Sequence, residues 1–202
     1  MRVQPATTAK QTTRGAFARH RAVFERTTAL EPDIAAGAEL LAKTIRRGNC
    51  VFFCGNGGSA ADSQHFAAEL TCRYRDDRRP LPGVALTVDT SALTAIGNDY
   101  RFEDVFSRQM TALGRRGDLL VAFSTSGRSK NVLRAMRAAR AKGMKVIFMT
   151  GAGGSSAGRR GGATLTIAVP DAETARIQEL HELICHTWFE YLDLALRARV
   201  RP

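Results

Sequence analysis

A histidine and a glutamate, His65 and Glu69, lie four residues apart in the sequence. On a helix this spacing places both side chains on one face. Near the carboxyl end of the chain, Gln178, Glu182 and His186 share a second helical face. A carboxylate and an imidazole can transfer protons in acid–base catalysis, and they can also bind a metal ion. Spacing alone equally allows an ordinary side-chain contact, since aligned pairs of this kind are common on helices.

A cluster of hydroxyl groups lies at residues 124–129, where the sequence STSGRS places four of them at a predicted helix start. Backbone N–H groups and the helix dipole favour an anion at such a place, and hydroxyls add donors for phosphate oxygens. A polar turn with one serine as N-cap would require only one of these hydroxyls. We therefore predict a phosphate-binding turn here.

A glycine-rich segment, GNGGS at residues 55–59, follows a short apolar run. Its glycines allow close backbone approach to a ligand, and Ser59 can cap the next helix, although a plain tight turn needs the same residues. The segment also fits a weak dinucleotide fingerprint, which requires an acidic residue about 20 positions further on. Asp89 comes 34 residues after Gly55, and no Gly-Lys-Ser/Thr follows, so neither a dinucleotide site nor a Walker loop is favoured.

The elements that must position these groups follow from the hydrophobic pattern. We predict strands at 50–54, 83–88, 119–123, 145–149 and 164–169, and a Gly/Ser-rich loop over 151–162. We predict helices at 14–30, 33–47, 59–70, 91–96, 103–113, 131–142 and 173–198. Strands that alternate with helices indicate an α/β fold, a doubly wound five-stranded parallel sheet flanked by helices, with an N-terminal helical pair. In such sheets ligands bind beyond the carboxyl ends of the strands.

Length and charge limit the class of protein. The 202-residue chain is expected to form a flexible tail over residues 1–13 and one domain over 14–202. Its formal net charge is +11, but basic residues are spread along the chain without interleaved aromatics, so we do not expect nucleic acid as the main partner. No apolar run approaches the roughly 18 residues that cross a bilayer. The basic amino-terminal stretch lacks the apolar core of a secretion signal and leaves a transit peptide open.

Four cysteines without a Cys-x-x-Cys pair fit a reducing compartment, and we expect a cytoplasmic protein.

Four segments together resemble the bacterial phosphoheptose isomerases, a family of SIS (sugar isomerase) proteins. They occur in the same order as in that family, and they are CGNGGSAADSQHFAAEL, TAIGNDYRFEDVFSRQ, STSGRSKNVLRA and ARIQELHELICH. The similarity covers about residues 33–195. The STSG loop alone would indicate only a SIS domain, whereas the four segments together are much more specific.

The resemblance implies roles for individual residues. The sugar would be bound by Asn56, Gly57, Gly58, Glu69, Asn98, Asp99 and Gln178, and its phosphate by Ser124, Thr125, Ser126 and Ser129. Zinc would be bound by His65, Glu69, Gln178 and His186, and Glu69 with His186 would form the acid–base pair. Gln178 and His186 are eight residues apart, about 12 Å along an ideal helix. They could share one metal only through a long reach of Gln178, an irregular helix or different subunits.

The activity that the resemblance implies is conversion of D-sedoheptulose 7-phosphate to D-glycero-D-manno-heptose 7-phosphate by proton transfer through an enediol. The family also implies a homotetramer with shared active sites. Two rivals remain at this stage. One is a non-catalytic SIS protein that binds a sugar phosphate or serves as a scaffold for a partner such as a replication initiator. The other is a nucleic-acid binder driven by net charge, whose binding would weaken steeply with added salt.

Overall fold

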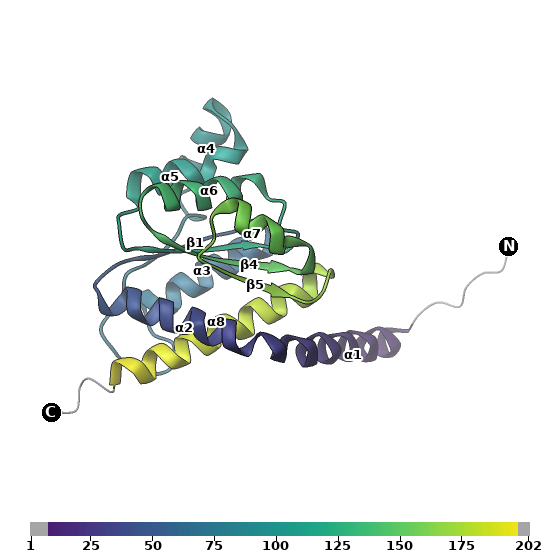
Figure 1. The fold of residues 1–202 in the computed structure, drawn as a ribbon. Helices are drawn as coiled ribbons and strands as arrows, with labels where there is room; N and C mark the ends of the chain where they lie inside the picture. Colours follow the sequence, from purple (N-terminus) through teal and green to yellow (C-terminus); the bar gives the residue numbers. More distant parts are fainter. Residues whose placement is uncertain (1–7, 198–202) are drawn as a thin grey trace.

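The computed structural model describes residues 8–197 and contains a five-stranded parallel sheet with strand order β2-β1-β3-β4-β5 (Figure 1). The strands are β1 (Val51–Cys54), β2 (Gly83–Ala85), β3 (Leu119–Ser124), β4 (Lys145–Gly151) and β5 (Leu165–Val169). The inner strands β1 and β3 are buried along their whole length, as expected for a sheet covered on both faces. The predicted fold class is confirmed.

Helices cover both faces of the sheet (Figure 1). One face carries α2 (Glu31–Arg46), α3 (Gly58–Thr71) and α8 (Thr174–Arg197), with α1 (Ala9–Thr27) packed on α8. The other face carries α5 (Val105–Leu113), α6 (Lys130–Ala141) and α7 (Ser155–Gly161), and α4 (Thr90–Asp99) packs on α5. Short 3₁₀ turns are η1 (Thr28–Leu30), η2 (Phe102–Asp104) and η3 (Ala152–Gly154).

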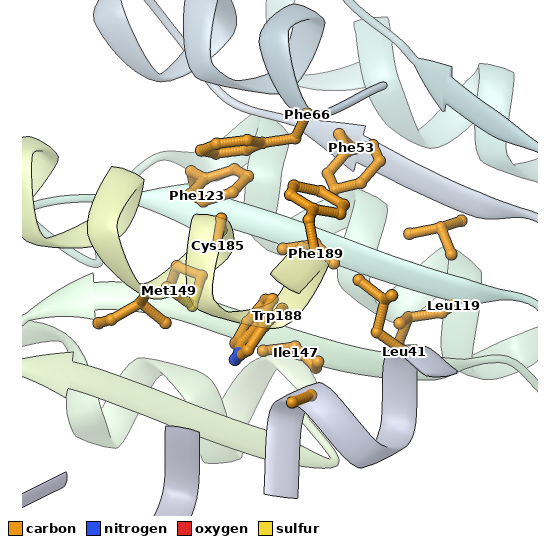
Figure 2. Close-up of a cluster of buried hydrophobic side chains, with 14 of the residues drawn as sticks. Leu41, Phe53, Phe66, Leu119, Phe123, Ile147, Met149, Cys185, Trp188 and Phe189 are labelled. Atoms are coloured by element: carbon orange, nitrogen blue, oxygen red, sulfur yellow. The ribbon is translucent and has the colours of Figure 1, made fainter. Parts of the chain in front are cut away.

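The two faces have separate hydrophobic cores, because side chains alternate along each strand. In β1, Phe53 belongs to the core beneath α2, α3 and α8, whereas Phe52 belongs to the core beneath α5 and α6. Figure 2 shows the first of these cores, in which Phe66 of α3, Phe123 of β3 and Phe189 of α8 lie together. This packing brings α3 and α8, which carry the predicted acid–base residues, side by side.

The predicted loop at 151–162 is wrong, because these residues form η3 and the short helix α7. The glycines of this segment allow close packing against the neighbouring strands and do not indicate a flexible loop. A Cβ at Gly158 would lie 2.2 Å from Thr166 Oγ1, and one at Gly154 would lie 1.8 Å from Thr150 Oγ1. Tertiary contacts therefore override the weak helix propensity of glycine.

Some boundaries also differ from the prediction. Helix α1 begins at Ala9 rather than residue 14, because Thr8 and Gln11 form a capping box. Strand β2 ends at Ala85, although the apolar pattern continues to residue 88. The predicted end of the last helix at residue 198 lies outside the described residues, as do residues 1–7 of the predicted tail. The division into tail and domain stays a prediction.

None of the helices among residues 8–197 is long and apolar enough to cross a membrane.

Gly37 provides a test of the packing between α2 and α8. A Cβ there would lie 2.6 Å from Trp188 Cζ2, and Trp188 is held in place by the hydrogen bond from its Nε1 to the carbonyl oxygen of Ile34 at 2.8 Å. We predict that Gly37→Ala lowers the free energy of unfolding by about 1–3 kcal/mol through overpacking. The matched control is Gly15→Ala in α1, where a Cβ meets only the mobile end of Arg19.

This control should raise the free energy of unfolding by up to about 1 kcal/mol, the usual gain from replacing glycine in a helix. Urea denaturation of both variants measures the difference, and equal effects of the two substitutions would contradict the predicted clash.

Candidate active site

The imidazole of His65 lies at the centre of a polar cluster between α3 and α8. Its Nε2 is 3.0 Å from Glu69 Oε1, and its Nδ1 is 3.3 Å from Glu182 Oε1. His186 approaches from α8, with its Nε2 3.5 Å from His65 Nε2. Tyr74 stacks on the ring of His186 with centroids 5.6 Å apart. The structure thus brings together the predicted residues His65, Glu69 and His186.

The cluster has donor atoms that fit a metal ion. His65, Glu182 and His186 each offer a ligand atom, and these atoms lie within 4.8 Å of one another. Glu69 Oε2 is buried and has no hydrogen-bond partner among the described residues. Two imidazoles with carboxylates form the mixed nitrogen and oxygen set that zinc accepts. A buried carboxylate oxygen without a partner is also available to receive a proton.

Gln178 lies one turn of α8 before Glu182, and its amide lies against the glycine loop. A Cβ at Gly58 would lie 2.5 Å from Gln178 Nε2, so only glycine allows this approach. The structure also brings the carboxylate of Glu182, which was not among the predicted ligands, beside His65 and His186. The four-residue zinc set that includes Gln178 stays a prediction.

The hydroxyl-rich loop at residues 124–129 is compact and joins β3 to α6. Ser124 Oγ donates to Ser129 Oγ at 2.9 Å and accepts from the Ser129 backbone N–H at 3.4 Å. Ser129 is the N-cap of α6, yet its side chain makes no capping bond. The Val132 N–H donates to the side chain of Asn131 at 2.9 Å, but none of the hydrogen bonds among the described residues caps the N–H groups of Lys130 and Asn131, which suits an anion site.

Residues of strand β4 form hydrogen bonds with the backbone of this loop. Thr150 Oγ1 donates to the carbonyl oxygen of Ser124 at 2.7 Å, and the Gly151 N–H donates to the carbonyl oxygen of Thr125 at 2.9 Å. Ser126 is exposed, and its Oγ accepts from the Arg128 N–H at 3.2 Å. Two hydrogen bonds from β4 therefore hold the loop, while the hydroxyl of the exposed Ser126 stays available to a ligand.

The glycine loop after β1 lies beside the hydroxyl loop, because β1 and β3 are neighbours in the sheet. Gly57 has φ of 57°, a left-handed conformation that favours glycine. Asn56 and Asn131 exchange two side-chain hydrogen bonds, at 3.0 and 2.7 Å, and so join the two loops. Asn131 is buried and was not among the predicted residues. Its position in the first turn of α6 is the signal that sequence reasoning missed.

Asn98 and Asp99 lie apart from the other predicted residues. Both are exposed at the end of α4, where Asn98 Nδ2 donates to Asp99 Oδ1 at 2.8 Å. Helix α4 packs on α5 and η2, has no buried residue and protrudes from the opposite side of the sheet (Figure 1). Within one chain, the structure does not bring these two side chains to the cluster on α3 and α8.

Comparisons with known proteins agree with this architecture. The sequence profile of the SIS domain family matches residues 17–151. The phosphoheptose isomerase of Campylobacter concisus is 51% identical over 178 residues, which cover 88% of this chain and 93% of that protein. The chain belongs to the phosphoheptose isomerase family. The resemblance drawn from the four sequence segments is therefore confirmed.

Solved structures of the phosphoheptose isomerase family have the same fold as this chain. The enzyme of Neisseria gonorrhoeae has a TM-score of 0.85 at 43% identity, covering 92% of this chain and 99% of that one. The enzyme of Francisella tularensis has a TM-score of 0.88 at 35% identity, covering 93% of this chain and 100% of that one. The likeness thus includes the helices that carry the polar cluster.

A third carboxylate, Asp62, lies near the cluster of this phosphoheptose isomerase family member. Burial and the nearby charge of Glu182 raise the pKa of Asp62 from 3.8 to about 6, although His65 opposes the shift. Its Oδ2 is buried without a partner among the described residues. Asp62 precedes His65 by three residues and therefore shares its helical face, a spacing that could have identified it from the sequence.

His181 is a second histidine of α8, but it points to the sheet rather than the cluster. It is fully buried, and its Nε2 lies 3.2 Å from the carbonyl oxygen of Thr150. Burial lowers the pKa of His181 from 6.5 to about 4, although the bond to Thr150 opposes the shift. The imidazole is therefore neutral near pH 7 and contacts the strand that supports the hydroxyl loop.

The buried neutral state of His181 predicts a pH dependence of stability. As the pH falls below 6.5, the unfolded chain takes up a proton before the folded protein does. The contribution of His181 to stability is complete above pH 6.5 and is lost as the pH falls toward 4, by about 3 kcal/mol in total. We predict that His181→Gln, which keeps a donor but does not titrate, loses less stability than the wild type over this interval.

Urea denaturation of both proteins at pH 7 and pH 4.5 measures the difference, and parallel losses would contradict the neutral assignment.

Proposed function

We propose that this chain is an aldose–ketose isomerase that converts D-sedoheptulose 7-phosphate to D-glycero-D-manno-heptose 7-phosphate. The observation that carries the proposal is the contact of His65, Glu69 and His186 between α3 and α8. Membership of the phosphoheptose isomerase family supports the choice of substrate. The hydroxyl loop supplies the phosphate site that such a substrate requires.

The reaction moves a proton between adjacent carbons through an enediol. Glu69 is the proposed base, which removes a proton from the carbon beside the carbonyl and returns it to the neighbouring carbon. Its Oε1 is oriented by His65, and its Oε2, which has no hydrogen-bond partner in the part of the chain that the structure describes, can take the proton. His186 is the proposed partner that exchanges protons between the two oxygens. No proton is gained or lost overall.

We infer that zinc is bound at the same cluster. His65 and His186 are two of the zinc ligands that the family resemblance implies, and their ligand atoms also lie close to a carboxylate oxygen of Glu182. The further ligands would come from Glu69, Gln178 and Glu182. When bound, zinc would polarise the substrate carbonyl and stabilise the developing oxyanion. Orientation of the substrate and removal of the carbon-bound proton remain the work of side chains.

The position of α4 supports a homotetramer with shared active sites. Asn98 and Asp99 can contribute to a sugar site only if another subunit brings α4 to it, because they lie far from the cluster in one chain. Large apolar side chains near α4, Tyr100 and Phe102, are 57% and 64% exposed and are suited to such a contact. A cytoplasmic location fits the four free cysteines.

The carboxylate of Glu69 provides the decisive test between an enzyme and a non-catalytic sugar-phosphate protein. We predict that Glu69→Gln lowers kcat at least roughly 1000-fold, since the amide cannot accept the carbon-bound proton. NMR in D₂O measures both turnover of sedoheptulose 7-phosphate and exchange of the carbon-bound proton with solvent. Glu25→Gln, at an exposed position of α1, is the control and should keep wild-type turnover.

Near-normal turnover of Glu69→Gln would exclude Glu69 as the base. Binding of the substrate by the wild type without any exchange would instead support the non-catalytic alternative.

Removal of the metal gives an independent test. We predict that dialysis against a chelator lowers kcat at least about 100-fold and that stoichiometric zinc restores it, because the carbonyl loses its polarising cation. His186→Ala should bind zinc more weakly in a competition with a metal-sensitive dye, by roughly 10-fold or more. Full activity of a protein that holds far less than one zinc per chain would overturn the role of zinc.

A further inference from the structure

An arginine outside the predicted site lies between the two helices that carry the acid–base pair. Arg78 belongs to the segment 72–82 that joins α3 to β2, and its Nε donates to Asp193 Oδ1 of α8 at 3.0 Å. The two side chains are only 11% and 4% exposed. A buried ion pair contributes little net stability, because the loss of hydration offsets the attraction. Its position therefore suggests a role other than holding the fold together.

The guanidinium of Arg78 also binds the end of α3. Its Nη2 donates to the carbonyl oxygen of Glu69 at 2.6 Å, and its Nη1 donates to the carbonyl oxygen of Leu70 at 3.0 Å. Carbonyls in the last turn of a helix have no partners within the helix itself. Arg78 thus fixes the backbone of the residue whose side chain is the proposed base.

Asp193 makes the corresponding connection to His186. It follows His186 by seven residues on α8, which is two turns along nearly the same face. Its Oδ2 accepts from the Arg75 backbone N–H at 3.3 Å. Arg75 directly follows Tyr74, whose ring stacks on the imidazole of His186. The carboxylate therefore holds both the helix of His186 and the segment that covers its ring.

We propose that Arg78 and Asp193 form a clamp that sets the separation of Glu69 and His186, which makes Arg78 a positioning residue for the proton transfer. The inference rests on the proposed function for its catalytic part. All side-chain hydrogen bonds of Arg78 among the described residues are with α3, α8 and its own segment. Loss of the clamp should therefore lower kcat and zinc affinity without affecting the binding of phosphate at residues 124–129.

The test replaces both partners, Arg78→Met together with Asp193→Leu, so that no buried charge is left alone. We expect cooperative thermal unfolding close to that of the wild type, a kcat roughly 10- to 100-fold lower, and a KM within about twofold. Inhibition by inorganic phosphate should not change. Zinc affinity, measured by dye competition, should fall roughly 10-fold because His65 and His186 come from different helices.

Two further variants make the result specific. Arg19→Met with Glu173→Leu removes an exposed ion pair that joins α1 to the start of α8, and it should leave kcat and zinc affinity unchanged. Arg78→Lys keeps the charge beside Asp193 and should recover part of the lost kcat. If the double variant does not fold, Arg78→Lys decides: a reduced kcat with an unchanged KM supports the clamp, and a wild-type kcat overturns it.

Wild-type kcat and zinc affinity in the folded double variant would overturn the inference while the proposed function stands. An increase in KM with unchanged kcat would overturn it as well. If the wild type itself fails to isomerise sedoheptulose 7-phosphate, the proposed function fails. The zinc titration of the wild type and the double variant then still decides whether the clamp sets the separation of the two helices.

Discussion

The ring of Phe66 is the contact on which the geometry of the polar cluster depends. It packs against Phe123 of β3 and Phe189 of α8, with ring centroids 5.7 and 5.9 Å apart (Figure 2). The same ring lies perpendicular to the imidazole of His186, with ring centroids 6.1 Å apart. Phe66 also directly follows His65 in the sequence. Because close-packed interiors transmit small displacements, the positions of both histidines are fixed by the apolar side chains beneath them.

The sheet contributes a second constraint, since its parallel strands end at a common edge. The loop after β1 and the loop after β3 are separated by almost seventy residues of sequence, yet they meet because the strands are adjacent. Helix α8 crosses beside this edge and presents Gln178 to the first loop and His186 to α3. The proposed site for a sugar phosphate thus needs no dedicated domain, only side chains placed where three elements converge.

Local patterns predicted much of this arrangement. Buried strands, the hydroxyl cluster and the pairing of His65 with Glu69 each depend on residues close in sequence, so their spacing carries the information. The approach of Glu182 to His65 depends on how α8 is rotated against α3, which no local pattern encodes. Glycines at 154 and 158 were misread for the same reason, because their packing partners come from distant strands. Asn131 could have been suspected from its place in the first turn of α6, but its reciprocal bonds with Asn56, 75 residues away, could not.

The pair of amides that joins the two loops has a consequence for how a ligand is held. Asn56 and Asn131 are neutral at every pH at which the protein is folded, and each satisfies the other. Attraction between charged groups weakens as ions are added, whereas a bond between two uncharged amides does not. The bonds that join the glycine loop to the start of α6 are therefore insensitive to salt and acidity, even though the ligand proposed for this edge of the sheet is an anion.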